Sequence, residues 1–190
     1  MIHPLLRQVK NLVRWLLWGG KVQSRSSLER LYRKVDPWGY RQNPDDQLRK
    51  DKILAALGDR QFKRALDLGC GEGWITQDLP AEEIVGVDIS SQAIERARQT
   101  ARGESYITCD LNKDDLPEGL FDLIVATGVL YSHYIVPRVL QKIMKKLVLG
   151  GYFLSCHIKD WEQFQIPLSK IHEEEFTYRG RTEHLVLYRK

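Results

Sequence analysis

The sequence feature that most constrains the fold is a glycine-rich stretch that follows an apolar run. Residues 65–74 read ALDLGCGEGW, so an apolar strand with an acid near its end leads into three alternating glycines. Glycine permits a tight turn between a strand and a helix, and it lets a ligand approach the backbone without a Cβ in the way. The stretch therefore predicts an α/β fold with a ligand site at the end of this strand.

The spacing of these glycines separates three kinds of nucleotide site. A dinucleotide fingerprint GxGxxG that starts at Gly69 requires glycine at position 74, where the sequence has Trp74. A Walker A loop requires Gly-Lys-Ser/Thr, which the stretch lacks. With Asp67 two residues before Gly69, the stretch instead resembles motif I of the class I S-adenosylmethionine (SAM)-dependent methyltransferases, (D/E)xGxGxG.

The rest of the chain alternates between strand and helix patterns in the order of that family. The predicted strands are 64–68, 84–88, 105–109, 121–126 and 151–156, and the predicted helices are 46–57, 74–78, 91–101 and 136–147. Two further β-type runs, 176–179 and 184–189, flank Gly180 and predict a hairpin. The expected fold class is α/β: a Rossmann-like, seven-stranded methyltransferase sheet, mostly parallel with a C-terminal antiparallel hairpin, and with helices on both faces.

The resemblance implies cofactor contacts at the ends of these strands. Asp88 ends the second strand, where a carboxylate can accept hydrogen bonds from both ribose hydroxyls. Asp110 ends the third strand, and an acid at that point of the family faces the adenine amino group. The expected contacts of SAM and its product S-adenosyl-L-homocysteine (SAH) are Trp38, Tyr40, Asp67, Gly69, Cys70, Gly71, Gly73, Asp88, Ile89, Asp110, Leu111 and Thr127. No metal site is expected, because the three cysteines form no CxxC pair and no Cys/His cluster.

The region after the fourth strand indicates the acceptor class. Residues 126–134 read ATGVLYSHY, without the Asn/Asp-Pro-Pro-Tyr/Phe motif that marks methylation of nucleobase amino groups or Gln side chains. Together with residues 36–40 (DPWGY) and the end of the chain, this region resembles the nodulation-protein S-type N-methyltransferases, which methylate an amino sugar of a chitooligosaccharide. The resemblance implies N-methylation of an amino sugar or related amine. O-methylation of a sugar or other metabolite, RNA methylation and a non-catalytic partner protein with the same fold stay open as alternatives.

Candidate catalytic residues follow the fourth strand, where open α/β sheets place their ligands. An amine acceptor need only arrive deprotonated, whereas a hydroxyl acceptor is helped by a general base. We expect His133 to be that base, since histidine titrates near neutral pH, with Tyr131 beside it. His157, after the fifth strand, is expected to have a structural or substrate-facing role.

Positive charge is concentrated near the N-terminus. Residues 1–35 hold eight Lys or Arg and one Glu, whereas the whole chain has a formal net charge of +4. Residues 5–18 predict an amphipathic helix that is shorter than the roughly 20 residues needed to span a bilayer. We therefore divide the chain into a basic amphipathic arm or lid (1–44) and a methyltransferase domain (45–190).

The role of the predicted 5–18 helix stays open. It can pack on the domain, lie on an anionic membrane surface or contact a protein partner. The few dispersed cysteines favour the cytoplasm, with a peripheral membrane location left open by the helix. The expected substrate is a small molecule or glycan, no nucleic acid partner is expected, and the oligomeric state is left open.

Overall fold

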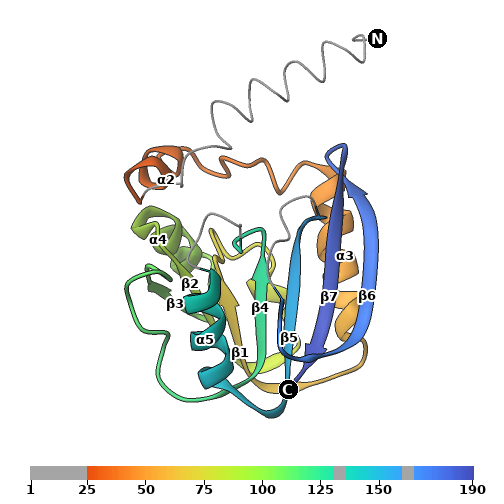
Figure 1. Ribbon diagram of the computed structural model, residues 1–190. Helices are drawn as coiled ribbons and strands as arrows, with labels where there is room; N and C mark the ends of the chain where they lie inside the picture. Colours follow the sequence, from red (N-terminus) through yellow and green to blue (C-terminus); the bar gives the residue numbers. More distant parts are fainter. Residues whose placement is uncertain (1–24, 131–135, 160–164) are drawn as a thin grey trace.

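The seven predicted strands form one sheet in the computed structural model, which describes residues 25–130, 136–159 and 165–190 (Figure 1). The elements in chain order are α2 (Arg25–Leu31), α3 (Pro44–Leu57), β1 (Phe62–Leu68), the 3₁₀ helix η1 (Thr76–Asp78), β2 (Ala81–Asp88), α4 (Ser91–Gln99), β3 (Ser105–Thr108), β4 (Phe121–Thr127), α5 (Val136–Lys146), β5 (Leu147–Ile158), β6 (Ser169–Tyr178) and β7 (Arg181–Arg189).

The strand order is β3-β2-β1-β4-β5-β7-β6. The first five strands pair in parallel, and β7 pairs antiparallel with both β5 and β6. The predicted fold class, with its C-terminal antiparallel hairpin, is confirmed. The first strand, β1, lies inside the sheet. β2 and β3 follow on one side of it, whereas β4 and β5 lie on the other side, so the strand order reverses between β1 and β4. Open α/β sheets bind their ligands at the carboxyl ends of the strands beside such a reversal.

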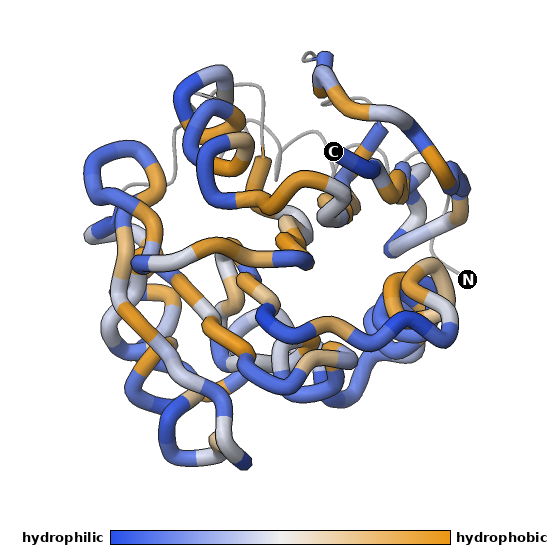
Figure 2. Tube along the Cα trace, turned by 90° about the horizontal axis from the view of Figure 1, so that it is seen from below, coloured by the Kyte–Doolittle hydropathy of each residue, from blue (hydrophilic) through white to orange (hydrophobic). Residues whose placement is uncertain are grey.

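Helices cover both faces of the sheet. Successive residues of a strand point to opposite faces, so a central strand packs against helices on both sides. Leu66 and Ile124 face α5 and its Ile143 in one buried cluster. Ala65 and Leu123 lie in a second cluster that includes residues of α3. The central strands are apolar on both faces, as parallel strands buried on both sides are. Figure 2 shows these apolar stretches in the interior and hydrophilic segments around the outside.

Two predicted elements differ most from the observed ones. The predicted helix at 74–78 is a turn followed by η1, and Pro80 lies two residues beyond it; a residue that precedes proline disfavours the α conformation. The hairpin strand predicted at 176–179 begins earlier, at Ser169. Residues 169–175 are mostly exposed and include four charged side chains, as is usual for the edge strand of a sheet, so they lack the alternating pattern of a half-buried strand.

The segment before α3 contacts the domain through α2, which the sequence analysis did not predict. Glu29 of α2 accepts hydrogen bonds from the backbone N–H of Ser91 at 2.8 Å and from the Ser90 hydroxyl at 3.0 Å. An acid at this place satisfies the free N–H groups at the start of α4 and interacts favourably with the helix dipole. The division of the chain at residue 44 stays a prediction, and residues 5–18 lie outside the described part. None of the described helices is long and apolar enough to span a membrane.

Candidate functional site

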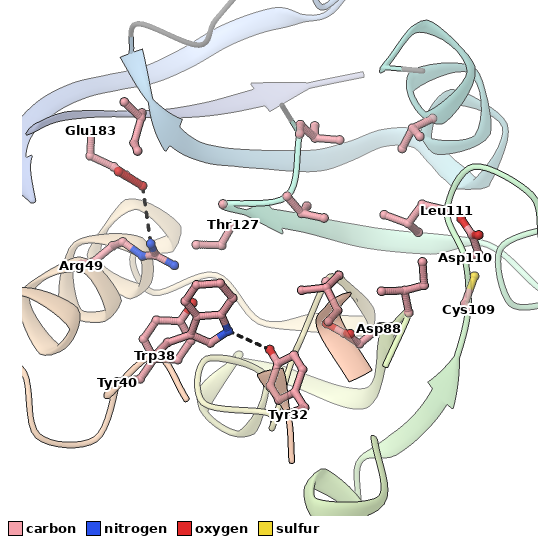
Figure 3. Close-up of a pocket in the computed structure, with 18 of the residues that line it drawn as sticks. Tyr32, Trp38, Tyr40, Arg49, Asp88, Cys109, Asp110, Leu111, Thr127 and Glu183 are labelled. Atoms are coloured by element: carbon pink, nitrogen blue, oxygen red, sulfur yellow. Dashed lines mark hydrogen bonds and ion pairs between the residues drawn. The ribbon is translucent and has the colours of Figure 1, made fainter. Parts of the chain in front are cut away.

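A cavity of about 230 Å³ lies at the carboxyl ends of the parallel strands, beside the reversal between β1 and β4 (Figure 3). Loops after β1 to β4, the end of β5, the segment before α3, α3 itself and the β6–β7 hairpin line it. Its lining residues are Leu28, Tyr32, Trp38, Tyr40, Arg49, Gly69, Asp88, Ile89, Cys109, Asp110, Leu111, Asn112, Thr127, Gly128, Val129, Leu130, Val139, Ile158, Tyr178, Arg179 and Glu183. Side chains from the two halves of the sheet therefore meet in one space.

Asp88 is the buried acid at one end of the cavity. Its Oδ1 accepts from the N–H of Ser90 at 2.8 Å, and its Oδ2 accepts from the N–H of Gly71 at 2.9 Å. Burial raises the pKa of Asp88, and the two backbone hydrogen bonds act in the opposite direction. A carboxylate has about four lone-pair sites, so the Asp88 side chain keeps acceptor capacity for a ligand in the cavity.

The glycine loop adopts a backbone conformation that other residues rarely take. Gly69 has φ +74°, and a Cβ there would lie 2.8 Å from Cγ2 of Val129. Gly71 has φ +55°, and a Cβ there would lie 2.8 Å from the Tyr32 hydroxyl oxygen. The loop requires glycine at these positions both for its turn and for its close contacts with protein atoms.

Asp67 lies behind the cavity and not in its lining. Its Oδ2 accepts a hydrogen bond from the Thr76 hydroxyl at 2.6 Å, and the residue is almost completely buried. Burial raises the pKa of Asp67 to about 6. Cys70, Gly71 and Gly73 also stand outside the lining, so this part of the predicted cofactor set shapes the loop around the cavity.

A strap formed by residues 32–41 crosses the cavity next to Asp88. The indole N–H of Trp38 donates to the Tyr32 hydroxyl at 3.1 Å, and both aromatic rings line the cavity. The strap is tied down at its middle, because Glu72 accepts from the backbone N–H of Asp36 at 3.1 Å and from Nε of Arg96 at 2.8 Å. Aromatic surface is thereby held over the cavity by charged groups outside it.

The opposite end of the cavity contains buried charges. Asp46 of α3 accepts from the Tyr178 hydroxyl at 2.6 Å and from Nε of Arg179 at 3.0 Å. The Arg49 guanidinium lies over the Tyr178 ring, 4.7 Å from its centroid, and Nη1 of Arg49 is 3.6 Å from Oε1 of Glu183. Figure 3 shows Arg49 and Glu183 at the end of the cavity remote from Asp88 and Asp110, with Thr127 between.

The structure brings eight of the predicted cofactor residues to this one cavity: Trp38, Tyr40, Gly69, Asp88, Ile89, Asp110, Leu111 and Thr127. The predicted catalytic residues Tyr131 and His133 lie outside the described residues, so their role stays a prediction. His157 is buried behind the lining, 3.0 Å from the Ser155 hydroxyl through Nδ1. Within the three described ranges, no group of three or more His, Cys, Asp and Glu could hold a metal ion.

Sequence reasoning missed the lining residues Tyr32, Arg49, Tyr178 and Glu183. Arg49 lies in the polar run 45–52 of a helix, and charged residues in such a run usually face solvent. Glu183 stands at the start of a β-type run, where nothing in the pattern marks it as buried. The burial of Arg49 and Glu183 follows from how the hairpin packs against α3, and the local sequence does not show this packing.

Comparison with known proteins identifies the family. A family model described as a methyltransferase domain matches residues 60–188. The malonyl-[acyl-carrier protein] O-methyltransferase of Legionella pneumophila is 31% identical over 129 residues, which cover 59% of this chain and 45% of that protein. The mitochondrial arginine-hydroxylase NDUFAF5 of Rattus norvegicus is 33% identical over 138 residues, which cover 66% of this chain and 40% of that protein. The matched part is thus less than half the length of either curated relative.

Solved structures share most of the fold. The N-methyltransferase NodS of Bradyrhizobium japonicum WM9, in complex with SAH, superposes with a TM-score of 0.76 at 23% identity, covering 87% of this chain and 97% of that one. The magnesium protoporphyrin IX methyltransferase of Synechocystis PCC 6803, with bound SAM, gives a TM-score of 0.68 at 15% identity, covering 90% and 99%. The chain therefore belongs to the methyltransferase-domain family, with the class I fold that its glycine motif predicted.

Proposed function

We propose that this protein transfers a methyl group from SAM to the amino group of a small molecule, with amino sugars as the acceptor class. The observation that carries the proposal is the cavity beside the reversal of strand order, with the buried Asp88 carboxylate at one end and the Arg49 and Glu183 pair at the other. One end suits a nucleoside, and the other suits charged or polar groups.

The lining fits SAM part by part. The free acceptor capacity of Asp88 suits the ribose hydroxyls, and Ile89, Asp110 and Leu111 lie next along the lining, where an adenine would follow. Gly69 lines the cavity with backbone alone and no side chain. Trp38 and Tyr40 add aromatic faces, which attract a cation such as the sulfonium.

Arg49 is the residue we assign to the carboxylate of the methionine moiety. Its guanidinium makes no hydrogen bond to another residue of the described ranges, although its side chain is only 9% exposed. A guanidinium offers five N–H donors in a planar fork that matches a carboxylate. The only anionic group of SAM is that carboxylate, and Arg49 lies at the end of the cavity where it would arrive.

When SAM is bound, it supplies a methyl group that its sulfonium makes electrophilic. The protein has to hold the acceptor in line with that group, and positioning of this kind can contribute roughly 7–11 kcal/mol. The aromatic strap and the β6–β7 hairpin line the cavity, and burial of a ligand between them would strengthen electrostatic interactions there. An amine acceptor needs no further activation once it is deprotonated.

The acceptor class rests on the resemblance of the 36–40 and C-terminal motifs to nodulation-protein S-type enzymes. The fold match to NodS, whose name is that of an N-methyltransferase, supports it. O-methylation is the alternative that a specific observation favours, because a curated relative is a malonyl-[acyl-carrier protein] O-methyltransferase. Under that alternative, His133 and Tyr131 are the proposed general bases for the acceptor oxygen.

Two measurements test the proposal. Calorimetric titration with SAM and SAH should show binding, and methyl-labelled SAM should then transfer label to glucosamine or a deacetylated chitooligosaccharide. N-acetylglucosamine and glucose are the matched controls, since they keep the hydroxyls and lack the free amine. Label on both controls at the rate seen with glucosamine would favour O-methylation, and a folded protein that binds neither SAM nor SAH would refute the cofactor assignment.

A further inference from the structure

Glu183 is a buried carboxylate with unused hydrogen-bonding capacity. It lies at the start of β7, is 1% exposed and lines the cavity. Its Oε1 is 3.6 Å from Nη1 of Arg49 and 3.8 Å from the Cys156 sulfur. Its Oε2 is shielded from solvent and has no hydrogen-bond partner within residues 25–130, 136–159 and 165–190.

Such a carboxylate is costly for the apo protein. A buried ion normally needs both an opposite charge and hydrogen bonds to offset the loss of hydration. The neighbouring charges Asp46 and Arg179 bind each other, and the Tyr178 hydroxyl also donates to Asp46. Glu183 is therefore left with a long ion pair and a weak thiol contact, which is the condition expected of a group whose partner is a ligand.

The position of Glu183 separates it from the nucleoside end. Asp88, Ile89 and Asp110 come from β2, β3 and the loops that follow them, on one side of the reversal. Glu183 pairs with Ile158 of β5, on the other side, and Ile158 also lines the cavity. The two halves of the sheet thus give the cavity two functional ends, as Figure 3 shows.

We propose that Glu183 binds the amino group of the methyl acceptor through Oε2 and removes one proton from it. This inference rests on the proposed function, since it assigns a residue to the acceptor of that reaction. The acceptor arrives as an ammonium, R–NH₃⁺. One N–H bond breaks, its proton forms an O–H bond on Oε2, and the electron pair stays on nitrogen. That lone pair forms the N–CH₃ bond while the electrons of the S–CH₃ bond go to sulfur, giving R–NH₂⁺–CH₃ and SAH.

The surroundings of Glu183 favour this proton transfer. Burial raises the pKa of Glu183, and Arg49 and the Cys156 thiol act in the opposite direction. The titratable and charged groups that face Glu183 are Arg49 and Asp46 from α3 and Cys156 from β5. The residue of β6 that pairs with Glu183 is the apolar Phe176. A carboxylate that is poorly stabilised as an anion both attracts an ammonium and accepts its proton.

The experiment compares Glu183→Gln and Glu183→Asp with Glu82→Gln, an exposed carboxylate of β2 that lies outside the cavity lining. We expect all three variants to bind SAH with the wild-type dissociation constant within about twofold. With methyl-labelled SAM and glucosamine, Glu183→Gln should lower kcat/KM by roughly 10²–10⁴-fold, the usual contribution of a general base. Glu183→Asp keeps the charge and should retain part of the rate, while Glu82→Gln should match the wild type.

The pH profile adds a readout that loss of packing would not move. The wild-type kcat/KM should rise with pH through the pKa of the carboxyl group, and this limb should be absent from any residual activity of Glu183→Gln. If glucosamine is methylated and the two Glu183 variants keep the wild-type rate and profile, the inference is wrong and the proposed function stands. If Glu183→Gln stays folded but loses SAH binding, Glu183 holds the cofactor, and the inference is also wrong.

A third result concerns the function itself. If the wild type binds SAM but methylates neither glucosamine nor a deacetylated chitooligosaccharide, the proposed amine acceptor fails and the role of Glu183 fails with it. Should Glu183→Gln fail to fold, the charged Glu183→Asp variant decides. A wild-type rate and pH profile in that variant would overturn the inference, and a rate at least about tenfold lower with unchanged SAH affinity would support it.

Discussion

The backbone N–H of Gly71 donates to Oδ2 of Asp88 at 2.9 Å, so the acid at the end of β2 also fixes the glycine loop after β1. The same loop is joined to β2 by hydrogen bonds from the N–H groups of Gly69 and Cys70 to the carbonyl of Val87, at 2.7 and 3.0 Å. The cavity floor is therefore a single hydrogen-bonded unit. A change at Asp88 should act on the shape of the loop as well as on any ligand that Asp88 binds.

Replacement of Asp88 separates these two effects. Asp88→Ala should weaken SAH binding by about 1–3 kcal/mol through loss of an acceptor for buried hydroxyls, and it should also lower the melting temperature because the Gly71 N–H loses its partner. Asp88→Asn keeps one oxygen acceptor and should weaken binding less. Calorimetry and thermal unfolding check both, with Glu82→Gln as the matched control. An unchanged SAH affinity in Asp88→Ala would refute the ribose role.

The strap over the cavity should depend on Glu72. Glu72 accepts from the backbone N–H of Asp36 and from Nε of Arg96, which are hydrogen bonds to a charged group worth about 1.5–3 kcal/mol each. Glu72→Ala should increase amide hydrogen exchange in residues 32–41 and weaken SAH binding, while the core strands keep their protection. Glu95→Ala, which changes an exposed side chain on the neighbouring helix α4, is the control. Equal exchange of the strap in both variants would contradict its anchoring by Glu72.

The strand ends and the glycine turn of the site could be predicted from the sequence, because the features that form them are local. Asp67, Gly69 and Asp88 mark strand ends and a turn whose conformation only glycine adopts readily, so spacing alone predicted where β1 and β2 end. The prediction that these residues share a cofactor site came from the resemblance of the motifs to the class I methyltransferases. Asp67 shows the limit of that reasoning: its place in the motif is as expected, yet its side chain bonds Thr76 behind the cavity.

Other parts of the site depend on contacts between distant segments. Arg49 and Glu183 are 134 positions apart in the sequence and meet only because the β6–β7 hairpin packs beside α3. Neither stands in a motif, and each has the charge that usually indicates an exposed position. The charged strand β6 was underpredicted for a related reason, because an edge strand shows no alternating burial. Non-local packing therefore accounts for what the sequence did not predict.

The Arg49 and Glu183 pair should be coupled in stability. Removing one partner of a buried pair leaves an uncompensated charge, so Arg49→Met should lower the free energy of unfolding by about 3–5 kcal/mol. The double variant Arg49→Met with Glu183→Gln should be more stable than the sum of the single changes predicts, because both charges are gone. Urea denaturation of the four proteins measures the coupling. Additive single changes would show that the two groups do not interact at 3.6 Å.

Loss of the Arg49 guanidinium should also weaken binding of the cofactor. Arg49→Met should weaken SAH binding by about 1.5–3 kcal/mol, since the methionine carboxylate loses its charged donors. Arg49→Lys keeps the charge without the planar fork and should restore only part of the affinity. Calorimetry on variants confirmed to be folded checks this. Wild-type affinity in Arg49→Met would assign the carboxylate to other donors.

Asp67 should make the protein less stable as the pH rises from about 4 to about 6. Burial raises its pKa to about 6 in the folded state, whereas an unfolded aspartate titrates near pH 3.9. Between these values the folded state binds more protons than the unfolded state, so the free energy of unfolding falls with increasing pH. The loss amounts to about 3 kcal/mol when complete, at about 1.36 kcal/mol for each pH unit.

Asp67→Asn should remove this contribution, because the amide oxygen still accepts the Thr76 hydroxyl and carries no charge. Relative to the wild type, the variant should gain about 2 kcal/mol in free energy of unfolding between pH 4.5 and pH 7.5, because part of the titration lies below pH 4.5. Burial also raises the pKa of Asp88 and Glu183, so these residues give the wild type a slope of the same sign. The difference in free energy of unfolding between wild type and variant isolates Asp67, and urea denaturation measures it. The same difference at both pH values would contradict a raised pKa of Asp67.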